Sequence, residues 1–161
     1  MIKKRLGLVL GRFQPLHLGH ILYLIGRAFR ENDRVIICIG SAQKSDPLPI
    51  IERHERMEGQ LKLLSYLQAA YRIVDLIDPI PMNIWPSYVK QVCGITDETS
   101  NTFYRSDILP KIYEKKLIEL GFKITIVPRV PFYYKGPDGF YRLVDSASDI
   151  RRIHRELGGK I

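Results

Sequence analysis

Gly11-Arg12-Phe13-Gln14-Pro15-Leu16-His17-Leu18-Gly19-His20 is the stretch around which this chain is organised. The apolar run Leu6 to Leu10 precedes it without any alternation of polar residues, which predicts a strand buried on both faces. A helical pattern begins at about Leu18. A helix N-terminus offers unpaired N–H groups and the positive end of a dipole, so we expect this turn to attract phosphate.

Three side chains of this turn could direct hydrogen-bond donors at one anionic centre. They are Arg12, His17 and His20, and the two histidines flank Gly19, which lets a ligand approach the backbone between the two imidazoles. A single histidine here could be incidental to a polar helix cap. The three together, at a junction between a strand and a helix, indicate a catalytic site.

The next segments predict an α/β fold with a parallel sheet. Val35 to Ile39 is a second apolar run and ends at Gly40, so a strand, a helix and a strand follow one another within 40 residues. Such a unit is nearly always parallel and right-handed, and its ligands bind beyond the carboxyl ends of the strands. Further strands are predicted at 73–77, 99–104 and 123–127, with a helix at 108–120. We expect one Rossmann-like domain over residues 1–161, with about five parallel strands and helices on both faces.

Composition and charge restrict the possible functions. The chain has 161 residues, is 45% hydrophobic, and contains no apolar run near the roughly 20 residues that a membrane span needs. The formal net charge is +8, but the basic residues are scattered, so we expect phosphorylated small molecules rather than nucleic acid as partners. Cys38 and Cys93 have no metal-like neighbours in the sequence, which predicts free thiols in the cytoplasm and no protein metal site.

The sequence of this turn resembles a sequence motif of a known family. Gly11 to Pro15, followed by His17 to His20, resembles the opening of the HxGH nucleotidyltransferase superfamily, and within it the archaeal type of nicotinamide-nucleotide adenylyltransferase. The resemblance continues at Gly40–Ser45, Glu55-Arg56, Asn83–Trp85 and Ser146–Arg151. It implies a nucleotidyltransferase fold and a reaction in which nicotinamide mononucleotide and ATP give NAD and pyrophosphate. The family usually has Tyr-Ser-Gly-Asn where this chain has Tyr104-Arg105-Ser106-Asp107, which leaves the adenosine contacts open.

The same resemblance implies roles for individual residues. The catalytic group comprises Arg12, His17, His20 and Arg151. Residues expected to bind ATP are Gly11, Phe13, Gln14, Gly19, Ser106, Ser146 and Ser148. Residues expected to bind the acceptor are Ser41, Lys44, Arg56, Asn83 and Trp85, where Trp85 would stack on the nicotinamide ring. Mg²⁺ would arrive on the phosphates of ATP.

Several alternatives stay open at this point. Arg53 could be mistaken for Arg56, because Glu52-Arg53 repeats the dipeptide Glu55-Arg56. The acceptor could be nicotinate mononucleotide or another phosphate ester. The chain could also be a catalytically weak nucleotide-binding module, although a degenerate copy has no reason to keep both histidines. We expect a homo-oligomer, and the aromatic segment 128–145 could form a hairpin that seals a core or subunit surface or covers the substrate.

Overall fold

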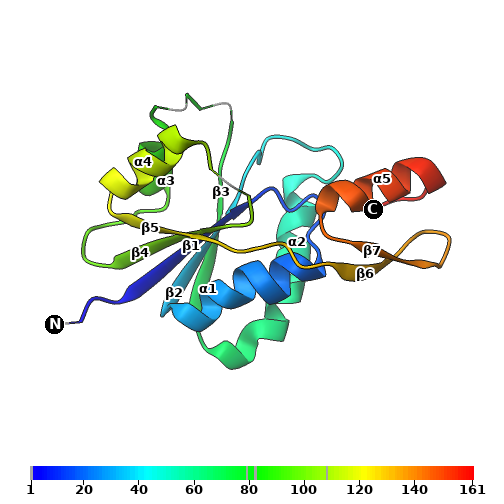
Figure 1. Cartoon of the computed structure of the whole chain (residues 1–161), viewed down its shortest axis with the longest axis horizontal. Helices are drawn as coiled ribbons and strands as arrows, with labels where there is room; N and C mark the ends of the chain where they lie inside the picture. Colours follow the sequence, from blue (N-terminus) through cyan, green and yellow to red (C-terminus); the bar gives the residue numbers. More distant parts are fainter. Residues whose placement is uncertain (1, 79, 82, 108) are drawn as a thin grey trace.

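Five parallel strands form the central sheet of the computed structural model, which describes residues 2–161 apart from 79, 82 and 108 (Figure 1). The strands lie in the order β3-β2-β1-β4-β5. Their bounds are Arg5–Gly11 for β1, Arg34–Ile39 for β2, Ala70–Asp75 for β3, Ser100–Arg105 for β4 and Phe122–Ile126 for β5. Because the chain moves outward from β1 to β3 and then returns to β4 on the other side, a crevice is expected at the carboxyl ends of β1 and β4.

One face of the sheet is covered by the connections to β2 and β3. The first is a π-helical segment, His20–Ile25, that continues as α1 (Gly26–Glu31), and the second is α2 (Ile50–Leu61), which continues as a 3₁₀ segment (Lys62–Leu67). These helices pack on Val9, Ile37 and Tyr104. The helix predicted to begin near Leu18 is therefore present, and its first part, His20–Ile25, is π-helical.

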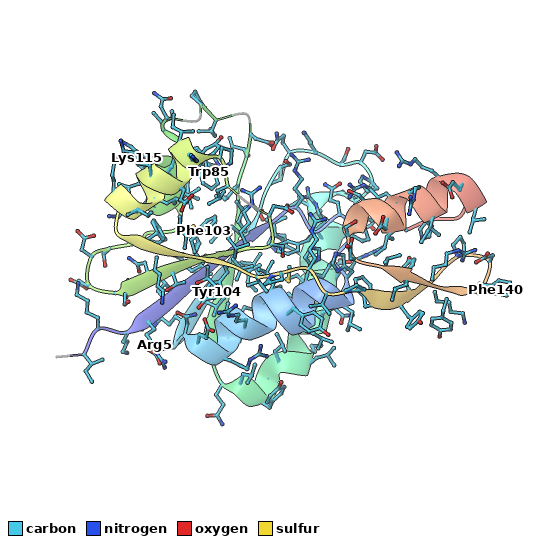
Figure 2. All side chains as sticks on the ribbon, in the orientation of Figure 1. Arg5, Trp85, Phe103, Tyr104, Lys115 and Phe140 are labelled. Atoms are coloured by element: carbon cyan, nitrogen blue, oxygen red, sulfur yellow. The ribbon has the colours of Figure 1, made fainter. Side chains whose placement is uncertain are left out.

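The other face is covered by α3 (Trp85–Val92) and α4 (Lys111–Glu119). These helices pack on Leu8, Cys38 and Phe103, so both faces of the sheet are buried as predicted. Figure 2 shows the alternation directly, because Phe103 lies on the side of Trp85 while its neighbour Tyr104 lies on the side of α1. Cys38 and Cys93 are buried free thiols whose Sγ atoms are 3.5 Å apart.

Two boundaries differ from the sequence prediction. The third strand runs from Ala70 to Asp75 rather than over 73–77. It is an edge strand whose first residues are exposed, so it carries Arg72 among apolar residues and does not read as a continuous apolar run. The predicted start of a helix at 108 lies outside the described residues, and α4 begins at Lys111.

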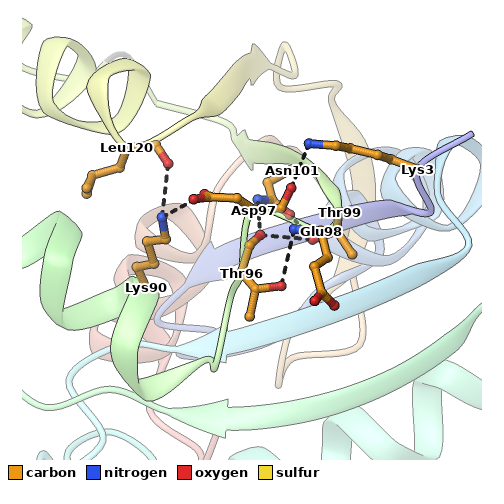
Figure 3. Close-up of polar contacts among 8 residues, drawn as sticks. All are labelled: Lys3, Lys90, Thr96, Asp97, Glu98, Thr99, Asn101 and Leu120. Carbon is orange, nitrogen blue, oxygen red and sulfur yellow. Dashed lines mark hydrogen bonds and ion pairs between the residues drawn. The ribbon is translucent and has the colours of Figure 1, made fainter. Parts of the chain in front are cut away.

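A cluster of polar contacts fixes the turn between α3 and β4 (Figure 3). Lys90 of α3 donates to Asp97 Oδ1 at 3.2 Å and to the carbonyl oxygen of Leu120, at the end of α4, at 3.5 Å. Lys3, just before β1, donates to the Asp97 carbonyl oxygen at 2.6 Å. These bonds join α3, α4 and β1 at the amino ends of the central strands, so the opposite, carboxyl ends remain open for a site.

The last part of the chain is a hairpin followed by a helix. Strands β6 (Phe132–Lys135) and β7 (Tyr141–Val144) are antiparallel, and α5 (Ala147–Leu157) packs on them through a small core of Phe132, Val144, Ile150 and Ile153. Figure 1 shows this unit extending from one end of the sheet. The predicted hairpin is therefore confirmed. Among the described residues, no helix is long and apolar enough to cross a membrane.

Candidate active site

A cavity of about 700 Å³ opens at the carboxyl ends of the central strands. It is lined by the turn after β1, the ends of β2 and β4, the start of α3 and the start of α5. The structure brings to it thirteen of the sixteen residues singled out in the sequence: Gly11, Arg12, Phe13, Gln14, His17, Gly19, His20, Ser41, Trp85, Ser106, Ser146, Ser148 and Arg151.

The two histidines are stacked on one another. Their ring centroids are 3.6 Å apart and the rings are inclined by 20°. Phe132 of the hairpin stacks on the outer side of His17 at 4.9 Å, and Phe13 meets His20 edge-on at 5.0 Å. A Cβ atom on Gly19 would lie 3.2 Å from the His17 ring and 3.3 Å from Phe132, so glycine suits this close packing.

Reciprocal hydrogen bonds hold the two rings and suggest their tautomers. The backbone N–H of His17 points at Nδ1 of His20 at 3.3 Å, and the backbone N–H of His20 points at Nδ1 of His17 at 3.4 Å. A ring nitrogen that accepts a hydrogen bond carries no proton, so the proton of each neutral ring lies on Nε2. The pair therefore presents two Nε2–H donors.

The surroundings keep both imidazoles neutral. Burial lowers the pKa of His17 to about 4, and the Arg129 guanidinium contributes in the same direction. Burial also holds the pKa of His20 well below its usual value, helped by His17 and Arg129. At neutral pH both rings therefore donate without carrying charge.

Cations and hydroxyls gather on the side of α5. Ser146 caps this helix by accepting a hydrogen bond from the Asp149 N–H at 3.2 Å. Arg151 donates to the Gln14 carbonyl oxygen at 2.5 Å and to Ser148 Oγ at 2.9 Å, which ties the start of α5 to the turn after β1. Arg12 is exposed and its side chain forms no hydrogen bond or ion pair with the residues that the structure describes. This arrangement suits a chain of phosphates.

A buried arginine that the sequence analysis set aside organises the loops around the cavity. Arg53 is fully buried, and its guanidinium donates to five carbonyl oxygens at 2.8 to 3.3 Å, those of Arg12, Gly40, Ser41, Ala42 and Lys44. Its Nε has no partner among the described residues. Burial lowers the pKa of Arg53, but a guanidinium stays charged at neutral pH.

The carbonyls that face Arg53 determine where the N–H groups point. In a trans peptide the C=O and the following N–H are antiparallel, so the N–H groups of Phe13 and Ser41 point away from Arg53. Both residues lie in the left-handed region, with φ of 53° and 50°, which is costly for residues other than glycine. Left-handed residues with free N–H groups form concave sites for anions. Arg53 therefore helps to hold in place a backbone whose shape suits an anion.

Arg56, the residue predicted instead, does not line the cavity. It donates to the Ile161 carbonyl oxygen at 2.8 Å and lies 3.9 Å from Glu52. Arg53 does not line the cavity either, but it bonds to the loops that border the cavity, whereas Arg56 bonds to Ile161. The sequence signal that could have singled out Arg53 was its position. It lies in the first turn of the predicted helix, shortly after the loop that contains Asp46-Pro47.

The expected acceptor residues divide into two groups. Trp85 lines the cavity and packs edge-on against Tyr113 at 5.2 Å and Phe103 at 6.2 Å. Ser41 also lines it and donates to Asp78 Oδ2 at 2.8 Å. Asn83 is exposed and lies outside the cavity, while Lys44 lines a second, neighbouring cavity. Only Trp85 and Ser41 are therefore placed for direct contact with a ligand in the main cavity.

The segment that departs from the family phrase lies in the cavity wall. Arg105, Ser106 and Asp107 all line the cavity. Asp107 forms an ion pair with Arg129, which follows β5. Where the family phrase has serine, this chain therefore has Arg105, whose pKa is lowered by burial; where the phrase has asparagine, it has Asp107, which pairs with Arg129.

Fold and site together define a nucleotidyltransferase of the α/β class, with an HxGH turn at the switch point of a parallel sheet. Residues 8–76 match the family model described as cytidylyltransferase-like. A nicotinamide-nucleotide adenylyltransferase of Saccharolobus solfataricus is 33% identical over 126 residues, which cover 76% of this chain and 69% of the relative. The chain belongs to the nicotinamide-nucleotide adenylyltransferase family.

Two further relatives agree with this assignment. The enzyme of that name from Thermococcus kodakarensis is 31% identical, with 94% of this chain and 72% of the relative covered. The one from Thermoplasma acidophilum is 29% identical, with 95% and 92% covered. Among solved structures, a pantothenate synthetase of Thermus thermophilus has a TM-score of 0.49 and 14% identity, covering 93% of this chain and 62% of that chain.

Replacing Arg53 should destabilise the protein strongly. Arg53→Met leaves five carbonyls without their shared donor, and each buried acceptor without a partner costs about 1–3 kcal/mol, so we expect a total loss of about 3 kcal/mol or more. We expect the unfolding temperature to fall by about 10 °C, since 1 kcal/mol corresponds to about 2–4 °C at this size. Arg56→Met is the matched control and should change it little. Equal melting temperatures for the two variants in differential scanning calorimetry would contradict the role given to Arg53.

Stability should also depend on pH through His17. Its pKa is about 4 in the folded protein, against an ordinary value of 6.5, so the unfolded chain takes up the proton first as the pH falls. The contribution, roughly 3 kcal/mol, is complete above pH 6.5 and is lost between pH 6.5 and 4. In urea unfolding, the free energy should therefore fall more steeply over this window for the parent than for His17→Gln. Parallel pH profiles would show that His17 titrates normally.

Proposed function

We propose that this protein joins nicotinamide mononucleotide to ATP and releases NAD and pyrophosphate. The observation that carries the proposal is the stacked pair of neutral imidazoles, which aims two Nε2–H donors at the switch point of the sheet. A phosphate oxygen of the mononucleotide attacks the α-phosphorus of ATP. The bond from that phosphorus to the bridging oxygen breaks, and its electron pair leaves with pyrophosphate. The activity for which the relatives are named supports the same reaction.

His17 and His20 stabilise the transition state. Their Nε2–H groups donate to the α-phosphoryl oxygens, on which negative charge is redistributed as the reaction proceeds. The rings are held from both sides by Phe132 and Phe13, so little reorganisation is needed at that moment. No protein nucleophile takes part, because the acceptor phosphate attacks directly.

Arg12 and Arg151 bind the outer phosphates of ATP. Ser148 is held against Arg151, and Ser146 caps the helix whose N-terminus faces the cavity. The remaining residues expected to contact ATP are Gly11, Phe13, Gln14, Gly19 and Ser106, which all line the same cavity. The ring of Phe13 is buried beneath His20, so its contribution comes through its backbone and through support of that histidine.

Magnesium fits this site as an ion that arrives with ATP. The described residues contain no group of three or more His, Cys, Asp or Glu side chains that could hold a metal. Mg²⁺ keeps several waters and takes further oxygens from substrate phosphates, so the cationic walls need no acidic cage for it. When bound, it neutralises part of the charge on the phosphates.

The acceptor lies on the side of Trp85. Its ring offers a flat surface for the cationic pyridine ring, and Ser41 lies at the carboxyl end of β2 near the acceptor phosphate. A location in the cytoplasm and a homo-oligomeric assembly remain predictions from the sequence.

Product analysis tests the proposed reaction. The purified protein with ATP, Mg²⁺ and nicotinamide mononucleotide should form NAD and pyrophosphate in equal amounts. His20→Ala should lower kcat by about 100-fold or more, the usual effect of removing one preorganised donor, with a smaller effect on KM for ATP. If the protein uses nicotinate mononucleotide as an acceptor and does not use nicotinamide mononucleotide, the choice of acceptor is overturned. Unchanged turnover in His20→Ala would overturn the choice of catalytic centre.

Trp85 should report binding of the acceptor directly, because it is the single tryptophan of the chain. Nicotinamide mononucleotide should quench its fluorescence, and ATP alone should quench it much less. Stacking on a cationic ring is worth about 1–2 kcal/mol, so Trp85→Ala should raise the acceptor KM roughly 5- to 30-fold and leave KM for ATP nearly unchanged. Trp85→Phe should recover part of the loss. A lower melting temperature with an unchanged acceptor KM would instead make Trp85 a packing residue.

A further inference from the structure

A second cavity, of about 540 Å³, adjoins the main one on the side of the phosphates. Both cavities are lined by Arg12, Gln14, Ser41 and Arg151, so these residues form a shared wall. The second cavity continues between the loop after β2 and the helix α5. In Figure 1 the later part of this cyan loop passes close to the start of α5. Its other lining residues are Lys44, Asp46, Pro47, His154, Arg155, Gly159 and Ile161.

The cavity is strongly basic, and its cations form no ion pair with the residues that the structure describes. Four of its side chains are cationic, namely Arg12, Lys44, Arg151 and Arg155, against the single acidic side chain of Asp46. Within the described part of the chain, none of the four cations forms an ion pair. Burial, followed by the nearby guanidiniums of Arg155 and Arg12, lowers the pKa of Arg151. Arg151 and Arg155 are like charges at i and i+4 of α5, which destabilises a helix. Their arrangement therefore favours binding of an anion and does not stabilise the fold.

The direction of the reaction identifies this anion. The α-phosphate lies at the histidines and the acceptor lies toward Trp85, so the leaving group points at Arg12 and Arg151, on the shared wall. As long as the dinucleotide occupies the main cavity, the side of Trp85 is closed to pyrophosphate. The opposite side of the wall carries Lys44 and Arg155, which have no role in the reaction derived above.

We propose that the second cavity binds pyrophosphate after the bond to the α-phosphorus breaks, and that pyrophosphate leaves through it. This inference rests on the proposed function. Arg155 and Lys44 take over the phosphate oxygens from Arg12 and Arg151, and the excess of cations over Asp46 offsets the negative charge of pyrophosphate. By microscopic reversibility, the same cavity admits pyrophosphate when the enzyme converts NAD and pyrophosphate back to ATP and the mononucleotide.

The reverse reaction provides the sharpest test. Arg155→Ala should raise KM for pyrophosphate about 10-fold and leave KM for NAD unchanged, since NAD does not reach the second cavity. The inhibition constant of pyrophosphate in the forward reaction should rise by a similar factor, whereas KM for ATP should rise much less. Arg155→Lys keeps the charge and should recover part of the affinity, and Lys44→Ala should act in the same direction as Arg155→Ala.

The matched control is Arg152→Ala. Arg152 is the neighbouring cation on α5, but it pairs with Asp149 Oδ1 at 3.3 Å and lines neither cavity. Its replacement should leave every constant unchanged. Equal effects of Arg152→Ala and Arg155→Ala would reduce the inference to general electrostatic attraction and overturn it.

Other outcomes also decide the question. Equal increases in KM for pyrophosphate and ATP in Arg155→Ala would make the cavity a part of the ATP site, and an increase in the acceptor KM would make it the acceptor phosphate site. Either result overturns the proposed exit. Calorimetric titration with pyrophosphate, without any nucleotide, separates this inference from the proposed function. Binding that Arg155→Ala weakens would support the cavity even in a protein that forms no NAD, and equal binding by both proteins would refute it.

Discussion

Five peptide carbonyls converge on one buried guanidinium, and the geometry of the site depends on this interaction. Arg53 comes from α2, but the carbonyls belong to the turn after β1 and to the loop after β2. These two segments lie next to one another only because β1 and β2 are parallel neighbours. A guanidinium has five donors in a fixed plane and cannot lose its charge, whereas a lysine ammonium has only three donors. The interaction therefore joins two loops and gives them a positive centre without a carboxylate that would repel phosphate.

The histidine pair depends on the same turn. Phe13 has a left-handed backbone, and its ring lies over Gly11, where a Cβ atom would be 2.8 Å away. That ring supports His20, while the hairpin supplies Phe132 to support His17. The two imidazoles are thus packed between Phe13, in the turn after β1, and Phe132, in the hairpin. This explains why a segment so distant in the sequence belongs to the site.

The sequence was sufficient for the architecture, and thirteen of the sixteen residues predicted for the site line one cavity. Runs such as Leu6–Leu10 and Val35–Ile39 identify buried parallel strands, and their carboxyl ends identify the position of the cavity. It was not sufficient where the deciding quantity is burial. Arg53 and Arg56 stand in identical dipeptides, and only the packing of α2 shows that Arg53 faces the loops while Arg56 faces the end of the chain. The predicted bounds of the edge strand β3 were shifted for a related reason. A half-exposed strand tolerates Arg72, so the strand begins before the apolar run that the prediction relied on.

The cations around the two histidines explain why these imidazoles can remain neutral in a site for phosphates. Arg12, Arg105, Arg129 and Arg151 all line the cavity, so the site attracts phosphates before the histidines contribute anything. A protonated histidine would bind the phosphates of the ground state as strongly as these arginines do, and uniform binding does not accelerate the chemical step. A neutral Nε2–H instead gains strength as charge shifts on the α-phosphoryl oxygens. Burial and Arg129 keep the two imidazoles neutral, so binding and catalysis are assigned to different side chains of the same cavity.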